Sequence, residues 1–155
     1  MKHTWIGIDP GKAGGYAVIE EHEWGQKITT VAWDDDSFVS DMQYISGTMG
    51  EGRTVVCALE KVGAMPGNGA VSLFHFGKSA GFIEGVLRTC HIPYQLVPPR
   101  KWKASFSLTN DKKLSIETCK RLFPNVDLRA TERCRTDSDG KAEALLLAEY
   151  AQRHL

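Results

Sequence analysis

The sequence feature that most constrains the fold is the short, nearly continuous apolar run Arg53-Thr-Val-Val-Cys-Ala-Leu-Glu60. A run of this kind is typical of a central strand that is buried on both faces. A sheet is buried on both faces when helices cover each of them. The run therefore predicts an α/β domain with a central sheet flanked by helices, and it ends in a carboxylate.

Four more strands are predicted, over residues 3–9, 15–20, 27–33 and 94–97. The first ends in Asp9, which is followed by a Pro-Gly turn signal, and the first three together predict an antiparallel meander. With the run described above, they predict a five-stranded mixed sheet. The chain is long enough for a sizeable core, and we expect one domain over residues 1–155.

Helices are predicted over residues 37–48, 71–90, 100–106, 111–123 and 140–153. The fourth is expected to start from Asn110 and to be closed by Pro124, because proline cannot continue a helix. Asp139 is expected to cap the last helix, since its side chain can accept hydrogen bonds from unpaired backbone N–H groups.

The composition is that of a soluble globular protein, with 42% hydrophobic and 25% charged residues. No apolar run approaches the length of a membrane span, and the amino terminus lacks the apolar region of a signal peptide. We expect the protein to act in the cytoplasm of a bacterium or phage-infected cell, or in an organelle if the source is eukaryotic. The cysteines are far apart and show no CxxC spacing, which predicts free thiols at Cys57, Cys90, Cys119 and Cys134.

Charge is unevenly distributed although the net charge is zero. Residues 1–60 carry ten acids against four bases, a net of −6, whereas residues 100–155 carry twelve bases against eight acids, a net of +4. Zero net charge alone argues against a nucleic-acid-binding protein, but the asymmetry indicates a molecule with a basic face. A solvated surface with uneven charge explains the same pattern, so the motifs must decide.

Four carboxylates are expected to lie together. Asp9 and Glu60 each end a predicted strand, and the carboxyl ends of neighbouring parallel strands meet at one edge of a sheet. Asp139 and Glu143 are four residues apart across a helix start, which places their Cβ atoms roughly 5–6 Å apart on one side. Hard divalent cations relieve the repulsion between such acids. The set predicts a nuclease site for Mg²⁺, with Mn²⁺ as an alternative, and for two ions roughly 3.5–4 Å apart that act on a phosphodiester.

Each acid also has a purely structural interpretation. Asp9 could initiate a turn, Asp139 alone could be only a helix cap, and Glu143 alone could be an exposed helix residue. Glu60 is harder to explain in this way, because a buried acid without partners is costly. Taken jointly, the four acids favour a metal site. Asp137 competes with Asp139 for the third position and is ranked second, because it precedes the helix and does not share its face.

Several segments resemble the RuvC-type Holliday junction resolvases, in the right order and over nearly the whole chain. They are Ile6-Gly-Ile-Asp-Pro-Gly11, Leu59-Glu60, Phe76-Gly77 to Gly81, Pro98-Pro-Arg-Lys-Trp-Lys103 and Asp139-Gly-Lys-Ala-Glu-Ala-Leu-Leu-Leu-Ala148. The chain is more similar to the phage-type and plant organellar branch than to the bacterial one. The former has a similar Met-Pro-Gly loop after the second acid and a final acid pair spaced by four, whereas the bacterial branch spaces its final two Asp residues by three.

The resemblance implies a ribonuclease H-like fold and a homodimer with two active sites. Each site would nick one strand of a four-way DNA junction, symmetrically, and would leave 5′-phosphate and 3′-hydroxyl ends. One Mg²⁺ would activate a water near Asp9 and Glu143, and a second, held by Asp9 and Glu60, would stabilise the leaving oxygen. Neither a membrane nor a small-molecule cofactor is implied.

Basic residues between positions 100 and 121 are candidates for DNA contact, because Lys and Arg on one face neutralise phosphates. A solvated helix face is the usual explanation for such a run. Lys103 and Lys112, however, match basic positions that flank the cleft in the resembled family, and Lys113 and Arg100 follow them as further candidates. Trp102 is expected to be a core anchor rather than a base-stacking residue.

The loop from Lys61 to Ala70 is the segment expected to probe the junction. Lys61 is a candidate phosphate contact, and the apolar tip Met65 could wedge between bases. A flexible loop with a buried methionine is the alternative.

Three glycines, Gly77, Gly81 and Gly85, recur every four residues in the predicted helix 71–90. Each costs about 1 kcal/mol relative to alanine in a helix interior, so the stripe needs an explanation. Close packing against the sheet is the simplest one. The resemblance implies a dimer interface on the opposite face, with Phe74 and Phe82.

Rival functions differ from a resolvase in testable ways. Another ribonuclease H-like nuclease, acting on RNA or on other branched DNA, would use the same acids, and only substrate competition would separate the two. A catalytically silent junction-binding module is disfavoured by the intact set of four acids. A sugar-kinase or actin-like ATPase also begins with Gly-Ile-Asp, but it needs two such domains, for which 155 residues are too few.

Overall fold

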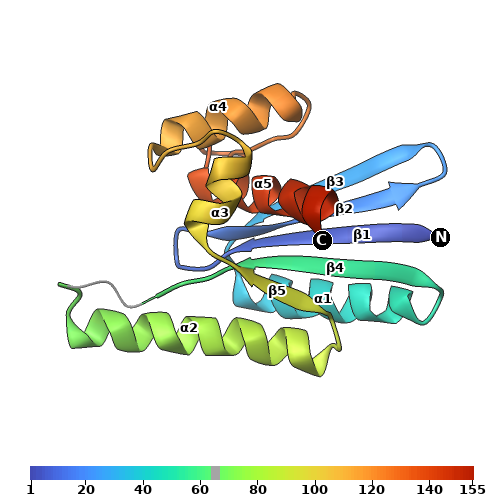
Figure 1. Ribbon diagram of the computed structural model, residues 1–155, viewed down its shortest axis with the longest axis horizontal. Coiled ribbons are helices and arrows are strands. Elements are labelled where there is room, and N and C mark those ends of the chain that lie inside the picture. Colours follow the sequence, from blue (N-terminus) through green and yellow to red (C-terminus); the bar gives the residue numbers. More distant parts are fainter. Residues whose placement is uncertain (64–66) are drawn as a thin grey trace.

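The computed structural model describes residues 1–63 and 67–155. Its centre is a five-stranded mixed sheet with the strand order β3-β2-β1-β4-β5, which confirms the predicted α/β architecture (Figure 1). The strands are β1 (Lys2–Asp9), β2 (Gly15–His22), β3 (Gly25–Ala32), β4 (Arg53–Glu60) and β5 (Tyr94–Val97). The first three form the predicted antiparallel meander. β4 pairs parallel with both β1 and β5.

Helices cover both faces of this sheet (Figure 1). They are α1 (Asp35–Met49), α2 (Ala70–Thr89), α3 (Pro99–Ser105), α4 (Lys112–Leu122) and α5 (Asp139–His154). One core cluster joins the sheet to α1 and α2, and the other joins it to α3, α4 and α5. In β4, Cys57 and Leu59 belong to the first cluster and Ala58 to the second, so this strand is buried on both faces as predicted.

Two helix-capping residues differ from the prediction. Asp111, not Asn110, caps α4, because its side chain accepts a hydrogen bond from the backbone N–H of Lys113 at 3.0 Å. The prediction that Asp139 caps α5 is wrong. Ser138 takes that position, and its hydroxyl accepts from the backbone N–H of Lys141 at 3.2 Å. Asp139 is instead the first residue of the helix, where a negative charge interacts favourably with the helix dipole.

α5 lies directly against β1 because two glycines allow backbone to meet backbone. A Cβ atom on Gly7 would lie 2.0 Å from the carbonyl oxygen of Ala144 and 2.2 Å from the nitrogen of Ala148. A Cβ atom on Gly140 would lie 2.2 Å from the carbonyl oxygen of Ala13, in the turn after β1. These distances leave no space for a side chain, so the glycines fix how closely the first half of α5 approaches the end of β1.

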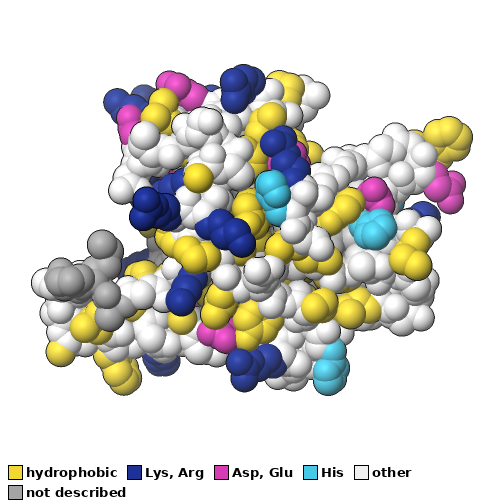
Figure 2. Space-filling model, in the orientation of Figure 1, with side chains coloured by type: hydrophobic (Ala, Val, Ile, Leu, Met, Phe, Trp, Pro, Cys, Tyr) yellow, Lys and Arg dark blue, Asp and Glu magenta, His cyan; other side chains and the backbone are white. Residues whose placement is uncertain are grey.

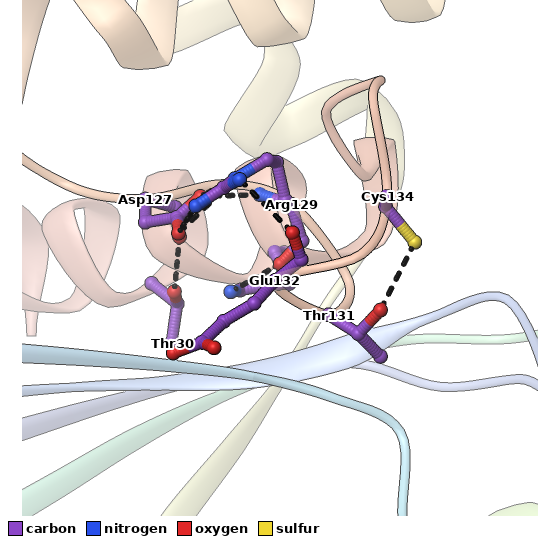
Figure 3. A network of polar contacts seen from close by, with 7 residues as sticks. Thr30, Asp127, Arg129, Thr131, Glu132 and Cys134 are labelled. Carbon is purple, nitrogen blue, oxygen red and sulfur yellow. Dashed lines mark hydrogen bonds and ion pairs between the residues drawn. The ribbon is translucent and has the colours of Figure 1, made fainter.

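The segment between α4 and α5 is held by a local polar network (Figure 3). The Arg129 guanidinium donates to the Asp127 carboxylate at 2.7 Å, and the carbonyl of Asp127 accepts a hydrogen bond from Thr30 on β3 at 3.3 Å. Lys141 of α5 donates to the carbonyl of Arg129 at 2.8 Å. The network therefore ties the start of α5 to the edge of the sheet.

The glycine stripe of α2 does not pack against the sheet, so that prediction is wrong. Cβ atoms built on Gly77, Gly81 and Gly85 would meet nothing within 4 Å in the described part of the chain. Helical periodicity shows that the three glycines share one face of the helix, but it does not show whether that face is turned to the core. The face that packs into the core is the opposite one, which carries Ile83 and Leu87. The stripe faces outward and lines part of an open groove of about 300 Å³ between α1 and α2.

The four cysteines are free, as predicted, and three of them are buried. Among the helices of the described residues, none is both long enough and apolar enough to span a membrane.

Candidate active site

Asp9 and Glu60 lie side by side at one edge of the sheet. They are the last residues of the parallel neighbours β1 and β4, and the residues before them, Ile8 and Leu59, are paired in register. Because side chains alternate along a strand, equivalent positions on paired strands point to the same face. The two carboxyl groups are close enough for the charge of Glu60 to act on Asp9.

Burial and mutual repulsion dominate the electrostatics of this pair. Burial raises the pKa of Asp9 well above its usual range, and the negative charges of Glu60 and Glu143 raise it further. Burial also raises the pKa of Glu60, whereas the hydrogen bond from the Trp102 indole acts to lower it. A cation bound here would compensate the negative charge that burial and mutual repulsion disfavour.

Glu143 comes to the same place from α5. It is 6% exposed, although it carries a charge, and two groups compensate for its burial. The Ser115 hydroxyl of α4 donates to Oε1 of Glu143 at 3.0 Å, and the Lys103 ammonium of α3 lies 3.4 Å from the same oxygen. Three helices on one face of the sheet thus position this carboxylate.

Asp139 is connected to the other acids through Lys112. Its carboxylate forms an ion pair with the Lys112 ammonium. The hydrogen bond to Asp139 raises the pKa of Lys112, and the charges of Glu143 and Asp9 contribute in the same direction. The competitor Asp137 pairs instead with Lys120 at 2.5 Å. The arrangement favours Asp139 over Asp137 as a site residue, and this assignment stays a prediction.

The donor set fits hard divalent cations in its chemistry. All four acids offer carboxylate oxygen, the donor that Mg²⁺ and Mn²⁺ prefer. Within residues 1–63 and 67–155, however, no three acidic, imidazole or thiol side chains stand close enough to form a ready-made metal cluster. The ammonium groups of Lys103 and Lys112 lie among the acids. The side chain of Lys112 is 65% exposed, which leaves it room to turn away when a cation binds.

The predicted DNA contacts fall into two groups. Lys103 and Lys112 lie within the acidic site itself rather than only at its borders. Arg100, Lys113 and Lys61 are exposed on α3, on α4 and directly after β4. Figure 2 shows Lys and Arg side chains gathered over and beside α3. Their role in DNA binding stays a prediction, and the predicted wedge, Met65, lies outside the described residues.

Sequence reasoning missed two side chains that hold the acids. Trp102 is fully buried, as expected of a core anchor, but its indole N–H also donates to Oε1 of Glu60 at 2.9 Å. Ser115 is buried beneath Glu143. The only signal for Trp102 is general, since buried indole N–H groups usually find a partner. No sequence pattern identified Ser115.

Replacing Trp102 with Phe should reduce catalysis without unfolding the protein. Phenylalanine keeps most of the packing but removes the donor to Glu60, and a hydrogen bond to a charged group contributes about 1.5–3 kcal/mol. We expect roughly a tenfold or greater loss of cleavage rate, with thermal stability reduced only moderately. Trp5→Phe, a matched change in the same core cluster without contact to an acid, should leave the rate near that of the wild type. Equal rates for Trp102→Phe and the wild type would show that this hydrogen bond does not position Glu60.

The mixed sheet of order β3-β2-β1-β4-β5, with helices on both faces, is the arrangement of the ribonuclease H-like fold. No protein-family model matches the sequence, and no curated protein matches it. Among solved structures, the chain is similar to RuvC from T. thermophilus in complex with a Holliday junction substrate. The identity is 14%, the match covers 99% of this chain and 96% of that chain, and the TM-score is 0.56. A second structure, of Thermus thermophilus RuvC, matches with 15% identity, coverage of 96% and 91%, and a TM-score of 0.50. The chain therefore has the fold of RuvC over nearly its whole length.

Proposed function

We propose that this protein is a structure-selective endodeoxyribonuclease that resolves four-way DNA junctions. The observation that carries the proposal is the placement of Asp9 and Glu60 on adjacent strand ends, with Glu143 beside them on α5, in a chain that has the RuvC fold. The neighbour of known structure was determined with a Holliday junction substrate, which supports a junction as the DNA for this chain as well. Buried acids that repel one another are costly to a fold, and a bound cation would offset that cost.

Divalent cations, Mg²⁺ or Mn²⁺, would supply a nucleophilic water and stabilise the leaving oxygen, and Asp9, Glu60, Asp139 and Glu143 would hold two of them. The side chains define where the reaction takes place. Trp102 and Ser115 fix the orientations of Glu60 and Glu143. Attack of the water on phosphorus would break the bond between phosphorus and the 3′ oxygen. The 3′ oxygen would take up a proton, and the phosphate would stay on the 5′ end. Lys103 and Lys112 would contact the phosphate.

The decisive experiment compares substrates. A synthetic mobile four-way junction, a replication fork, a plain duplex and an RNA–DNA hybrid are incubated with the protein, with and without Mg²⁺. We expect paired nicks in the junction, only in the presence of Mg²⁺, with ligatable 5′-phosphate ends. If junction and duplex were cut equally, the protein would be a nuclease but not a junction resolvase. Preferential cutting of the hybrid would favour a ribonuclease, and binding without any cutting would favour a silent junction-binding module.

Three carboxylate variants test which acid completes the site. We expect Asp139→Asn and Glu143→Gln each to lower the cleavage rate by at least roughly a hundredfold, because loss of a ligand charge exceeds the 10- to 100-fold effect typical of groups that only orient ligands. Asp137→Asn, two residues from Asp139 and paired with Lys120, should change the rate by less than about threefold. Rates are measured in single-turnover cleavage of the junction. A severe Asp137→Asn defect beside a mild Asp139→Asn defect would reverse the assignment.

Symmetric nicking requires two active sites, and we propose that a second copy binds the outward face of α2. Phe74 is 69% exposed, and it lies on the same helical face as the glycine stripe, three residues before Gly77. Phe82 is placed less favourably for this role, because its ring packs toward Phe38, with 6.4 Å between the centroids. A helix face of small residues with an exposed aromatic residue suits close packing against an identical helix.

The variant Gly81→Leu tests this interface. Apart from α2 itself, no part of the described residues lies within 4 Å of a Cβ atom at Gly81, so leucine should fit the single chain but keep a second α2 at a distance. We expect sedimentation equilibrium to show a shift from dimer to monomer, with unchanged far-ultraviolet circular dichroism. Gly47→Leu, at an equally open glycine of α1, is the matched control. A Gly81→Leu protein that stays dimeric would place the interface elsewhere.

A further inference from the structure

A second concave surface lies beside the acids, between the β1–β2 turn and the N-terminal half of α2. It is an open groove of about 610 Å³, a volume within the range of pockets that bind small organic groups. Lys12 lines it from the turn, Trp33 from the end of β3, and His75, Phe76 and Ser79 from α2. The turn that carries Gly11 and Lys12 follows the strand that ends at Asp9, so the groove and the acids lie at the same edge of the sheet. Figure 1 shows α2 extending past this edge.

Trp33 presents a fixed aromatic ring to this groove. Its indole N–H donates to the Asp35 carboxylate at 2.8 Å, and its ring packs on Phe38 and Tyr16 with centroid distances of 5.0 and 6.2 Å. Its backbone N–H donates to the carbonyl of Gly14 at 3.1 Å. The ring is half-buried and already ordered by these contacts. The Trp33 side chain therefore loses little conformational entropy when a ligand stacks on it.

The remaining lining supplies the other elements of nucleotide recognition. Phe76 is 42% exposed, and His75 beside it is also exposed. Ser79 offers a hydroxyl for hydrogen bonds, and the exposed Lys12 offers a positive charge on the side nearest the acids. Aromatic rings with one hydroxyl and one cation match an unpaired base with its phosphate, since bases stack on aromatic side chains irrespective of sequence.

Charge on the far side of Trp33 limits how much of a strand can enter. The exposed carboxylates Asp34, Asp35 and Asp36 follow Trp33 directly, at the start of α1. They would repel the phosphates of a strand that ran through the groove and past the indole. The charge pattern therefore suits a single inserted base whose backbone stays on the Lys12 side.

We propose that this groove accepts one unstacked base of the DNA strand that enters the acidic site, with Trp33 and Phe76 as stacking surfaces and Lys12 on the adjacent phosphate. The inference rests on the proposed function and adds a subsite to it. The subsite is separate from the face proposed for the second copy. His75, Phe76 and Ser79 lie on the side of α2 that faces the sheet edge, whereas the glycine stripe faces outward.

The test is photocrosslinking from defined bases. The cut position is first mapped with Mg²⁺, and 5-iododeoxyuridine is then placed at each of the three nucleotides on either side of it in the four-way junction. The junction is irradiated with the full-length protein in the absence of divalent metal, which keeps the DNA intact. We expect one position to crosslink to Trp33 or Phe76, identified by mass spectrometry of the adduct.

Binding measurements with variants complement the crosslinks. Trp33→Ala and Phe76→Ala should each weaken junction binding by roughly tenfold, the effect of losing one stacked base. Trp33→Phe should restore most of the affinity. Phe76 lies outside both core clusters, so its variant remains informative if Trp33→Ala unfolds. Trp24→Ala, at a 96% exposed tryptophan on the β2–β3 turn, is the matched control and should bind as the wild type does.

The outcomes separate the subsite from the function. Junction-selective cleavage by the wild type, with normal binding by both groove variants and crosslinks only outside the groove, would overturn the subsite and leave the proposed function intact. A wild-type protein that neither prefers nor cuts the junction would overturn the proposed function. Groove variants that lose dimerisation and show no crosslink would assign the groove to a second copy and overturn the subsite.

Discussion

The Asp9→Asn protein should bind a four-way junction about as tightly as the wild type and should cut it at least roughly a thousandfold more slowly. The charges of Glu60 and Glu143 both act on Asp9, and Asp9 is the acid shared by both cation positions proposed for the site. Asparagine has the same shape but cannot supply that charge. Junction binding is expected to depend mainly on Lys and Arg side chains elsewhere in the protein. Removing a negative charge near the DNA phosphates should not weaken it.

Single-turnover cleavage and fluorescence anisotropy with the same labelled junction measure the two quantities. Asp36→Asn, an exposed acid in the first turn of α1, is the control and should cut normally. The proposed site would be wrong if Asp9→Asn cut the junction as fast as the wild type. Loss of binding together with cleavage would instead indicate that Asp9 is needed for the fold.

Gly7→Ala should have the largest effect on stability. An added Cβ atom would lie 2.0 Å from one backbone atom of α5 and 2.2 Å from another, and backbone cannot yield as a flexible side chain can. Overpacking of a core typically costs 1–3 kcal/mol, and this contact belongs at or above the upper end of that range. We expect the free energy of unfolding, from urea denaturation, to fall by about 3 kcal/mol or more.

The opposite change is expected at Gly47, in the last turn of α1. No other part of the described chain lies within 4 Å of a Cβ atom there, and alanine in a helix is favoured over glycine by up to about 1 kcal/mol. Gly47→Ala should therefore raise the free energy of unfolding slightly. If Gly7→Ala were as stable as the wild type, α5 could not be seated on β1 as described.

The strands and two of the acids could be predicted because their signals are local. The apolar run ending at Glu60 and the shorter one ending at Asp9 each show where a strand stops, and parallel pairing then brings the ends together. The start of α5 was less accessible to prediction. Asp137, Ser138 and Asp139 are all good capping residues, and the choice of Ser138 depends on how the preceding loop is tied to β3.

Features that depend on tertiary packing could not be predicted. The glycine stripe of α2 was visible, but helical spacing does not show whether a face is turned to the core or to solvent. The hydrogen bond from Trp102 to Glu60 joins residues 42 positions apart, and the one from Ser115 to Glu143 spans 28. Lys103 and Lys112 were expected beside the acids on account of family likeness, whereas their ion pairs with Glu143 and Asp139 required the packed helices.

The backbone contact between α5 and β1 also determines how the site responds to thermal opening. Asp9 belongs to β1, whereas Asp139 and Glu143 belong to α5. The backbone contact that Gly7 and Gly140 allow, called the seam below, therefore lies between Asp9 on one side and the two acids of α5 on the other. Amide protons on either side of this seam, around Ile8 and Leu146, should exchange with deuterium only through global unfolding, whereas those in the outer turns of α2 should exchange through local opening. The spacing of the carboxylates is then as persistent as the fold itself.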